Sequence, residues 1–453
     1  MKRVTITSVL FLIVSLSAQL HATPPTGTQA DNNWWGFYDI SWFDQSNIQD
    51  EYTFTTAAQL AGLSYLINGN GNSGSSGTES PLRNKIFKLG ADIDLSDHYW
   101  VPIGQGQNSF GGWFDGQGHT ISGLYIDYSD AQYAYVGVAA NIHQGAANVN
   151  TGNMAGLFGR VNNQGADSYI KNIILDKGLV KTHPSNYSVG ALIGFNNRNA
   201  NLSVFNVINR GVEVIGGAHV GGLIGFSNAG VIYYNLANWA SVTMDYTSDV
   251  LPEAAVYGGG IIGGSQNVTS LNNSYNSGTV TKTSGSTNIF IGGLVGAIGT
   301  TTTPISNATS DNLTGDNNYY LDNNTYKDSG NSAGNDIFIG SAKSLNDMKT
   351  NEFVAALNIN NIGEQWVKKP NVDFPVFENT TTTGIKPLKA PSFTAYASHG
   401  IIFVSRIETG IVEVYNLTGQ KVWSNIAQEE LQIVLPKGIY IIKAAGATQK
   451  IIN

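Results

Sequence analysis

Five short apolar runs bracketed by glycine recur through the middle of the chain. They are MAGLFG at 154–159, VGALIG at 189–194, VGGLIG at 220–225, GGGIIG at 258–263 and IGGLVG at 291–296. Their final glycines are 35, 31, 38 and 33 residues apart. A repeat of this length is typical of a stacked array, because one unit is too small to bury its apolar face alone and its neighbours must cover it.

A second, strand-like segment lies between successive glycine runs and carries Asn and Gly at its corners. Examples are IKNIILDKGLV at 170–180, VFNVINRG at 204–211, VIYYNL at 231–236 and LNNSYNSGTV at 271–280. Each unit therefore holds two or three short strands and no helix. Successive units must pair strand to strand, which predicts a parallel sheet wound into a helix.

The glycines of these runs have two expected roles. Large residues on one rung can interlock with small ones on the next, and a corner glycine reaches positive φ without steric cost. We therefore expect Gly222→Val to lower the melting temperature by more than the exposure of the residue suggests. The register of the run at 258–263 is open by one residue.

The N-terminal part reads as a cap on this array. Thr56 and Gln59 match a capping box, and the apolar spacing that follows predicts a helix over 56–68 that ends at Gly69. The aromatic-rich segment 32–43 precedes it. We interpret this segment as a hydrophobic plug over the open end of the array, and a sugar-stacking platform is the alternative.

The C-terminal part changes character after residue 340. Residues 344–357 read as helical with Phe353, Val354 and Leu357 on one side, and we expect 341–379 to cap the far end of the array. A linker at 380–390 leads to a small domain at 391–453. Its six candidate strands, at 401–404, 411–415, 421–423, 431–435, 439–443 and 449–452, predict an antiparallel sandwich of Ig-like outline.

Composition narrows the functional classes. Charged residues make up only 12% of the chain and the formal net charge is −8, so no basic field is present to hold nucleic acid. The chain has no cysteine, which excludes a disulfide framework, a thiolate metal site, a cysteine nucleophile and a lipid-modified cysteine anchor.

The first 22 residues read as a secretory signal. Lys2 and Arg3 precede a short apolar stretch at 9–14, and small residues follow it. That stretch is too short to span a bilayer, which takes ~20 apolar residues, and no later segment is apolar enough to do so. We expect an exported protein without a transmembrane segment.

The glycine runs, together with 92–95, 100–104 and 114–121, resemble GLUG-repeat proteins of bacterial surfaces over about residues 50–330. The resemblance implies a right-handed parallel β-helix and an adhesin-like role, and it supplies no catalytic residues. Segments 410–422, 435–440 and 450–453 resemble the sorting domain of type IX secretion. That resemblance implies passage through the outer membrane, often followed by removal of the domain.

One grouping of acids and histidines could carry chemistry: Asp92, Asp94, His98, Asp115 and His119. A hydrolase could use two such carboxylates on either side of a glycosidic bond. A lyase would need calcium-binding carboxylates and a basic residue near the sugar. The favoured interpretation is structural, with each aspartate bonding to a turn.

Residues 311–336 are rich in Asp and Asn, including Asp311, Asp316, Asp322, Asp328 and Asp336. A structural Ca²⁺ loop is the alternative to a solvated closing loop, which we favour because the EF-hand spacing is absent.

The sequence thus predicts an all-β protein: a right-handed parallel β-helix with short capping helices, followed by a small antiparallel Ig-like sandwich. The expected organisation is a signal at 1–22, an N-terminal cap at 23–84, the β-helix at 85–340, a cap at 341–379, the linker at 380–390 and the sorting-like domain at 391–453.

We expect no enzyme and assign no catalytic, cofactor or metal residue. The expected function is adhesion or binding of carbohydrate or a host surface by a secreted or outer-surface protein, with Tyr233, Tyr234, Trp239 and Tyr246 as exposed-aromatic candidates that could equally be core residues. A polysaccharide lyase or glycoside hydrolase is the first alternative, and a passive structural spacer is the second.

Overall fold

The structure is a computed structural model. It describes residues 23–27, 31–69, 81–105, 108–129, 154–162, 167–182, 188–197, 201–228, 231–245, 256–266, 269–283, 289–298, 313–323, 339–361, 363–378, 394–398, 401–416, 420–444 and 447–452. The signal at 1–22 and the linker at 380–390 lie outside these residues. The chain divides into two compact units, Met1–Glu378 and Asn379–Asn453.

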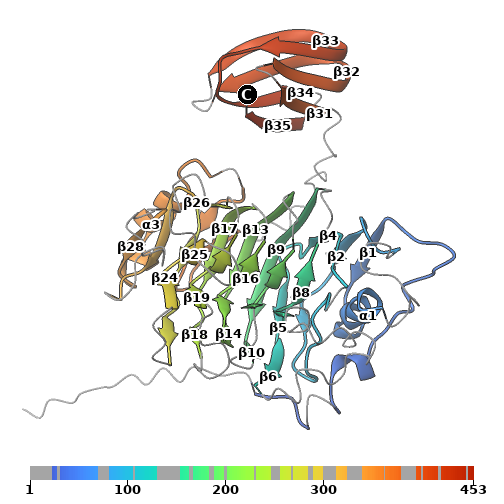
Figure 1. The fold of residues 1–453 in the computed structure, drawn as a ribbon, viewed down its shortest axis with the longest axis vertical. Coiled ribbons are helices and arrows are strands. Elements are labelled where there is room, and N and C mark those ends of the chain that lie inside the picture. The colour runs from blue at the N-terminus through green and yellow to red at the C-terminus, as the bar shows by residue number, and fades with distance from the viewer. Residues whose placement is uncertain are drawn as a thin grey trace, which may run out of the picture. The chain divides into compact units, whose positions relative to one another are not determined.

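The first unit is a stack of parallel strands, which Figure 1 shows side by side from blue β1 through green β9 to orange β28. A long sheet of 13 strands contains β1 (Glu51–Phe54), β2 (Ile86–Leu89), β3 (Ile93–Asp94), β4 (Trp113–Asp115), β5 (Thr120–Ser122), β9 (Ser168–Asp176), β13 (Leu202–Asn209), β17 (Ile232–Asn238), β21 (Thr269–Asn272), β22 (Tyr275–Asn276), β26 (Leu313–Thr314), β27 (Asn318–Leu321) and β28 (Gly340–Lys343).

Three further parallel sheets have five strands each. The second sheet holds β6 (Tyr125–Tyr128), β10 (Gly178–Thr182), β14 (Val212–Gly216), β18 (Val242–Met244) and β23 (Val280–Lys282). The third holds β7 (Met154–Ala155), β11 (Ser188–Gly190), β15 (His219–Gly221), β19 (Val256–Gly259) and β24 (Ile289–Gly292). The fourth holds β8 (Phe158–Val161), β12 (Ile193–Asn196), β16 (Ile224–Ser227), β20 (Ile262–Ser265) and β25 (Val295–Ile298).

One rung runs through the third, fourth, long and second sheets in turn, so it holds four strands where two or three were expected. Apolar side chains stack in register from rung to rung. One such column contains Ile126, Val180, Val214, Val242 and Val280, and another contains Phe158, Ile193, Ile224, Ile262 and Val295. These buried columns form one continuous core, and the stacked sheets agree with the predicted parallel solenoid.

The glycine runs form the corners between the third and fourth sheets. Gly225 shows why they are glycine, because a Cβ atom there would lie 2.5 Å from both the carbonyl oxygen of Gly194 and the amide nitrogen of Val189. A Cβ on Gly222 would meet the carbonyl oxygen of Gly260 and the side chain of Asn238. Neither glycine has positive φ, so the expected conformational reason is wrong for them and close packing of the backbone is the actual reason.

The strand pairing also fixes the register of the run at 258–263, which the sequence left open by one residue. Val220 pairs with Gly258 and Ile224 pairs with Ile262, so this run aligns residue for residue with the one before it. Only the first run differs. Ala155 pairs with Val189 while Phe158 pairs with Ile193, which makes the first corner one residue shorter.

Asparagines form a ladder along the middle of the long sheet. Asn172, Asn206, Asn235, Asn273 and Asn317 all have φ between 50° and 57°, a left-handed conformation that asparagine tolerates better than most residues. The Asn206 amide donates to the Asn172 side-chain oxygen at 2.9 Å, and the Asn235 amide donates to that of Asn206 at 3.0 Å. Each rung therefore changes strand direction at the same place.

A second ladder lies at the end of the long strands and is buried. The Asn209 amide donates to Asn238 Oδ1 and the Asn238 amide donates to Asn276 Oδ1, both at 2.9 Å. The Asn238 amide also donates to the carbonyl oxygen of Ala240 at 2.9 Å. These bonds satisfy polar groups that the turn into the second sheet would otherwise bury unpaired.

The N-terminal cap contains the predicted helix. α1 (Ala57–Ile67) starts after Thr56, whose side chain accepts from the Gln59 amide at 3.3 Å, and Gly69 follows its end with φ +90°. The preceding turn η1 (Trp34–Gly36) buries Trp34, whose indole donates to the Leu95 carbonyl oxygen at 3.1 Å. Tyr38, Trp42 and Phe43 pack against the solenoid core, which supports the plug interpretation.

The segment after β27 packs along a side of the solenoid, and its expected role as a far-end cap stays a prediction. β28 adds the last strand of the long sheet, and η2 (Asp347–Lys349), α3 (Asn351–Leu357), β29 (Trp366–Val367) and β30 (Val376–Phe377) follow. Phe353, Leu357 and Trp366 pack with Ile208, Ala237 and Tyr275 in a cluster separate from the core. Ile208, Ala237 and Tyr275 belong to successive rungs, so the segment lies along the stack. We name residues 344–378 the lateral cover.

Backbone carbonyls hold the lateral cover onto the asparagine ladder. The Asn273 amide donates to the carbonyl oxygens of Leu357 and Ile359 at 2.8 Å, and the Asn235 amide donates to that of Glu364 at 3.0 Å. The Trp366 indole donates to the Asn273 carbonyl oxygen at 2.9 Å. The outward amides of the ladder thus determine where the cover binds.

The second unit is one antiparallel sheet. Its strands are β31 (Thr394–Ser398), β32 (Ile401–Asn416), β33 (Lys421–Val434), β34 (Ile439–Ala444) and β35 (Ala447–Ile452). The predicted strands 401–404 and 411–415 form one continuous strand, β32, and the predicted strands 421–423 and 431–435 form β33. Register shifts between β32 and β33 let these long strands continue without a break. β31 pairs with the first part of β32 and β34 with its last part, around a core of their own. The Ig-like outline stays a prediction.

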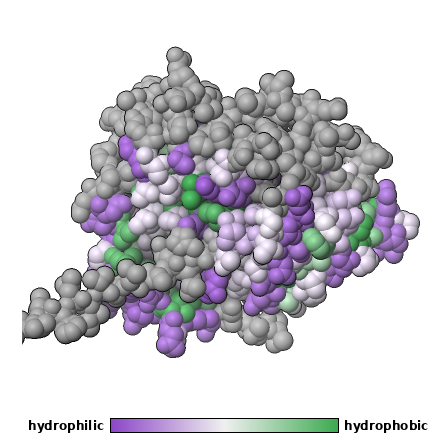
Figure 2. Space-filling view, turned by 90° about the horizontal axis from the view of Figure 1, so that it is seen from below, coloured by the Kyte–Doolittle hydropathy of each residue, from purple (hydrophilic) through white to green (hydrophobic). Residues whose placement is uncertain are grey.

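No helix among the described residues is long and apolar enough to cross a membrane. On the face seen in Figure 2, hydrophobic residues of the described part form small areas separated by hydrophilic ones.

Candidate functional site

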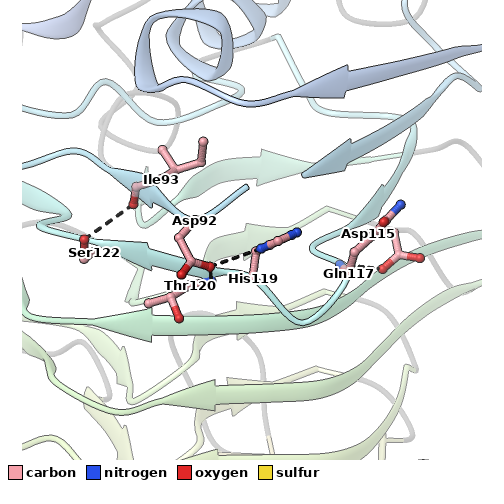
Figure 3. A network of polar contacts seen from close by, with 7 residues as sticks. All are labelled: Asp92, Ile93, Asp115, Gln117, His119, Thr120 and Ser122. Atoms are coloured by element: carbon pink, nitrogen blue, oxygen red, sulfur yellow. Dashed lines mark hydrogen bonds and ion pairs between the residues drawn. The ribbon is translucent and has the colours of Figure 1, made fainter. Parts of the chain in front are cut away.

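The acidic residues of the N-terminal rungs do not meet in one site. Asp94 Oδ1 accepts from the Ser96 amide at 3.0 Å, and Asp115 Oδ1 accepts from the Gln117 amide at 2.9 Å. Asp92 Oδ1 accepts from the Thr120 amide at 2.9 Å and lies 3.1 Å from His119 Nδ1. In Figure 3 Asp92, His119 and Thr120 lie together, whereas Asp115 lies beyond the turn and points away.

These contacts support the turn interpretation. The Thr120 amide is the main cause that lowers the pKa of Asp92, and His119 adds to it, so this carboxyl is held ionised as an acceptor. His98 belongs to another environment, where it stacks on Phe37 and burial lowers its pKa. The grouping therefore joins strands and turns and does not face a common substrate position.

The aromatic candidates are largely internal. Tyr233 is 0% exposed in the core, and Trp239 packs on Phe374 and donates to the Tyr275 hydroxyl at 2.8 Å. Tyr234 is half-buried and stacks on Phe205. Tyr246 lies outside the described residues. Of the three that the structure describes, only Tyr234 lies on the outward face of a strand and is partly exposed.

The acidic segment 311–336 is described only in part. The backbone amide of Asp316, between β26 and β27, donates to Asn272 Oδ1 at 3.1 Å, and Asp322 follows β27. Asp311, Asp328 and Asp336 lie outside the described residues. Among the residues that are described, no group of three His, Asp or Glu side chains is arranged to hold a metal ion.

A different set of side chains gathers on the outer face of the long sheet. Register places Asp115, Lys171, Phe205 and Tyr234 in one outward column, with Asp115 opposite Lys171 and Phe205 opposite Tyr234. Lys171 Nζ lies 3.3 Å from Asp115 Oδ2 and 4.5 Å from the centroid of the Tyr169 ring. We name Asp115, Tyr169, Lys171, Phe205, Tyr234 and Glu364 the outer-face cluster.

The polar and aromatic members of this cluster are partly shielded. The side chains of Lys171 and Asp115 are only 20% and 15% exposed, and the Asn172 amide also donates to Asp115 Oδ1 at 2.9 Å. The rings of Phe205 and Tyr234 lie 4.6 Å apart and nearly parallel. Burial, followed by the charge of Asp115, raises the pKa of Tyr169 to about 12, so its hydroxyl stays protonated at neutral pH.

Glu364 reaches this face from the lateral cover. Its backbone is fixed by the Asn235 bond, and Gly363 fits beneath because a Cβ there would lie 2.5 Å from Asn235 Nδ2 and 2.9 Å from the Tyr234 ring. Burial raises the pKa of the Glu364 carboxyl, and the nearby charge of Asp115 raises it further, while Lys171 opposes them.

Sequence reasoning found Asp115 and Tyr234 but missed the other members. Tyr169, Lys171 and Phe205 follow the period-two alternation of β9 and β13, so exact rung alignment would have brought them together. Glu364 had no such signal. It lies 193 positions after Lys171 in a segment that was expected to cap the end.

Comparisons with known proteins identify no family for this chain. The chain matches no protein-family model and no curated protein. A crystal structure from Bacteroides ovatus, of a protein provisionally named an immunoglobulin A1 protease, is similar with a TM-score of 0.49 and 19% identity. The match covers 78% of this chain and 100% of that one. At this identity the likeness transfers no activity, substrate or partner.

Proposed function

We propose that this protein is an exported, non-enzymatic binding protein that recognises carbohydrate through the outer-face cluster. The proposal extends the GLUG-like resemblance, which implies a right-handed β-helix with an adhesin-like role. The sorting-like C-terminal segment and the signal-like residues 1–22 support export to the outer surface or medium, and the Ig-like outline of the second unit belongs to the same proposal.

The observation that carries the proposal is the Asp115–Lys171 pair beside half-buried aromatic rings on an outward strand face. Sugar rings present hydroxyl groups to charged and amide side chains and C–H groups to aromatic carbon. The cluster offers both kinds of contact. It also lies on strands, which hold side chains more rigidly than loops do.

The enzyme alternative has less support, because Asp92, Asp94 and Asp115 each accept from backbone amides in separate places. A pair of carboxylates for glycoside hydrolysis has to flank one bond. A passive spacer is the remaining alternative and predicts no ligand at all.

A glycan-array screen of the mature chain tests the proposal, paired with activity assays on neutral and uronic-acid polysaccharides. We expect binding without turnover, and we expect Lys171→Ala to weaken it about tenfold, as loss of a charged hydrogen bond does. Arg210→Ala is the matched control, since Arg210 makes a similar ion pair at 2.8 Å with Asp176 of β9 and is not a member of the outer-face cluster. Turnover, or equal loss in both variants, would contradict the proposal.

A further inference from the structure

The Glu364 carboxylate is the one charge of the outer-face cluster that lacks a protein partner. It is half-buried, and it makes no hydrogen bond or ion pair with any residue that the structure describes. Its backbone carbonyl is fixed by Asn235 and Asn361, so the residue is held in place while its side chain is left unpaired. A shielded carboxylate without a partner costs stability, which favours a role in binding.

The surrounding charges leave this site negative. Asp115 is compensated by Lys171, and farther along the sheet Glu51 lies 2.6 Å from Lys88. Glu364 therefore supplies the excess negative charge of the face. A ligand group that donates hydrogen bonds and carries positive charge would compensate it, whereas a ligand carboxylate would be repelled.

Within the cluster, the ammonium group of Lys171 already has the contacts that a bound cation would make. Its Nζ lies 3.3 Å from a carboxylate oxygen, 4.5 Å from the Tyr169 ring centroid and 5.7 Å from that of Phe205. Carboxylate and aromatic faces are the usual environment of a recognised cation. Glu364 adds a second acceptor from the lateral cover, because Asn235 holds its backbone and the preceding Gly363 lies close against the Tyr234 ring. No lysine of the described residues forms an ion pair with it.

We propose that the outer-face cluster selects amino sugars, with Glu364 accepting from a protonated sugar amine. This inference rests on the proposed carbohydrate function and names the class of sugar. The neighbouring aromatic carbon of Phe205 and Tyr234 would contact the sugar ring, and the ion-paired Lys171 would bind its hydroxyl groups. The uncompensated charge of Glu364 would repel uronic-acid polymers.

The test compares four oligosaccharides of equal length by calorimetric titration of the mature chain, at a pH where the sugar amine is protonated. They are a β-1,4-glucosamine oligomer, its N-acetylated form, a cello-oligosaccharide and an oligogalacturonate. We expect the glucosamine oligomer to bind at least about tenfold more tightly than the others, with a preference that declines as salt is added. Glu364→Gln should abolish the preference, and Glu352→Gln, which changes an exposed glutamate of the same cover, should retain it.

The outcomes separate this inference from the proposed function. Binding of all the neutral oligosaccharides without preference for the amine would overturn the selectivity and leave carbohydrate binding intact. No binding of any oligosaccharide would overturn both. A lysine hexapeptide that binds as tightly as the glucosamine oligomer, with the same loss in Glu364→Gln, would show a site for positive charge alone and would overturn the sugar assignment.

Discussion

At the scale of single residues, the solenoid depends on how closely one rung approaches the next. The final glycines of the runs face backbone atoms of the preceding rung, as Gly225 faces Gly194 and Val189. Gly258 differs, because the atoms around its missing side chain belong to Met244. It occupies a position that holds valine on the two preceding rungs, and methionine can adapt its shape to fill that space.

This difference predicts unequal effects of the same substitution. Gly225→Ala should lower the free energy of unfolding by about 3 kcal/mol, because backbone on two sides cannot move away from the new methyl group. Gly258→Ala should cost less, and in a Met244→Ala background it should be neutral or stabilising. Urea denaturation of the single and double variants measures both. Equal costs for the two glycines in both backgrounds would contradict the packing argument.

Glu364 gives a pH-dependent prediction at the same scale. Burial raises the pKa of this carboxyl in the folded chain, so the folded state binds its proton more tightly than the unfolded state does. The contribution of protonated Glu364 to stability is therefore lost as pH rises through the folded pKa. Glu364→Gln should be more stable than the natural chain above that pKa, and the difference should vanish below the ordinary value of 4.5.

Thermal unfolding as a function of pH measures this difference. Glu352→Gln serves as the control because Glu352 is exposed, and it should not change the pH dependence. A Glu364→Gln curve parallel to that of the natural chain would mean that the carboxyl is not shielded.

At the scale of elements, the long sheet has two different faces. Residues on its inner face, such as Val207, belong to the core, and the next residue, Ile208, belongs to the cluster under the lateral cover. The asparagine ladder makes this possible, because its outward side-chain amides donate to carbonyl oxygens of the cover. The cover packs on Ile208, Ala237 and Tyr275, and Asn235 holds Glu364 of the cover on this face.

Removing the anchor of the cover should affect it before the solenoid. Trp366→Ala deletes a buried indole and its bond to the Asn273 carbonyl oxygen, a change of the kind that costs about 3–5 kcal/mol. We expect faster amide hydrogen exchange in α3, β29 and β30 and unchanged exchange in β11, β12 and β16. Leu345→Ala, which truncates an exposed side chain of the same segment, is the control. Uniform acceleration across all rungs would mean that the cover and the solenoid unfold together.

At the scale of the whole molecule, the two compact units have separate cores. Every residue of the core formed by Val404, Val412 and Ile442 comes from the second unit, and the clusters of the first unit end at Phe377. Units with separate cores can unfold separately. The finer domain boundaries that we expect from the sequence stay predictions.

Differential scanning calorimetry should therefore resolve two transitions in the full chain. A chain that ends at Glu378 should lose one of them and keep the other at the same temperature, because no residue of the solenoid core is removed. A shift of the remaining transition by many degrees would show that the second unit contributes to the stability of the solenoid.

The sequence by itself determined the stacked array, the α1 helix and the antiparallel character of the last unit. Each of these depends on local signals: the recurrence of the glycine runs, the Thr56 cap with Gly69, and alternating apolar residues between turns. Such signals are carried by residues close together in the chain, so periodicity and capping rules read them directly.

Only the tertiary structure decided what the outward residues do. Asp92 and Asp115 are close in sequence yet bond to different turns, whereas Asp115, Lys171 and Glu364 gather from segments up to 249 positions apart. Rung register brings the first two together, and the lateral cover adds the third. Neither register nor the placement of a cover is encoded by local periodicity, because both depend on how complete rungs pack against one another.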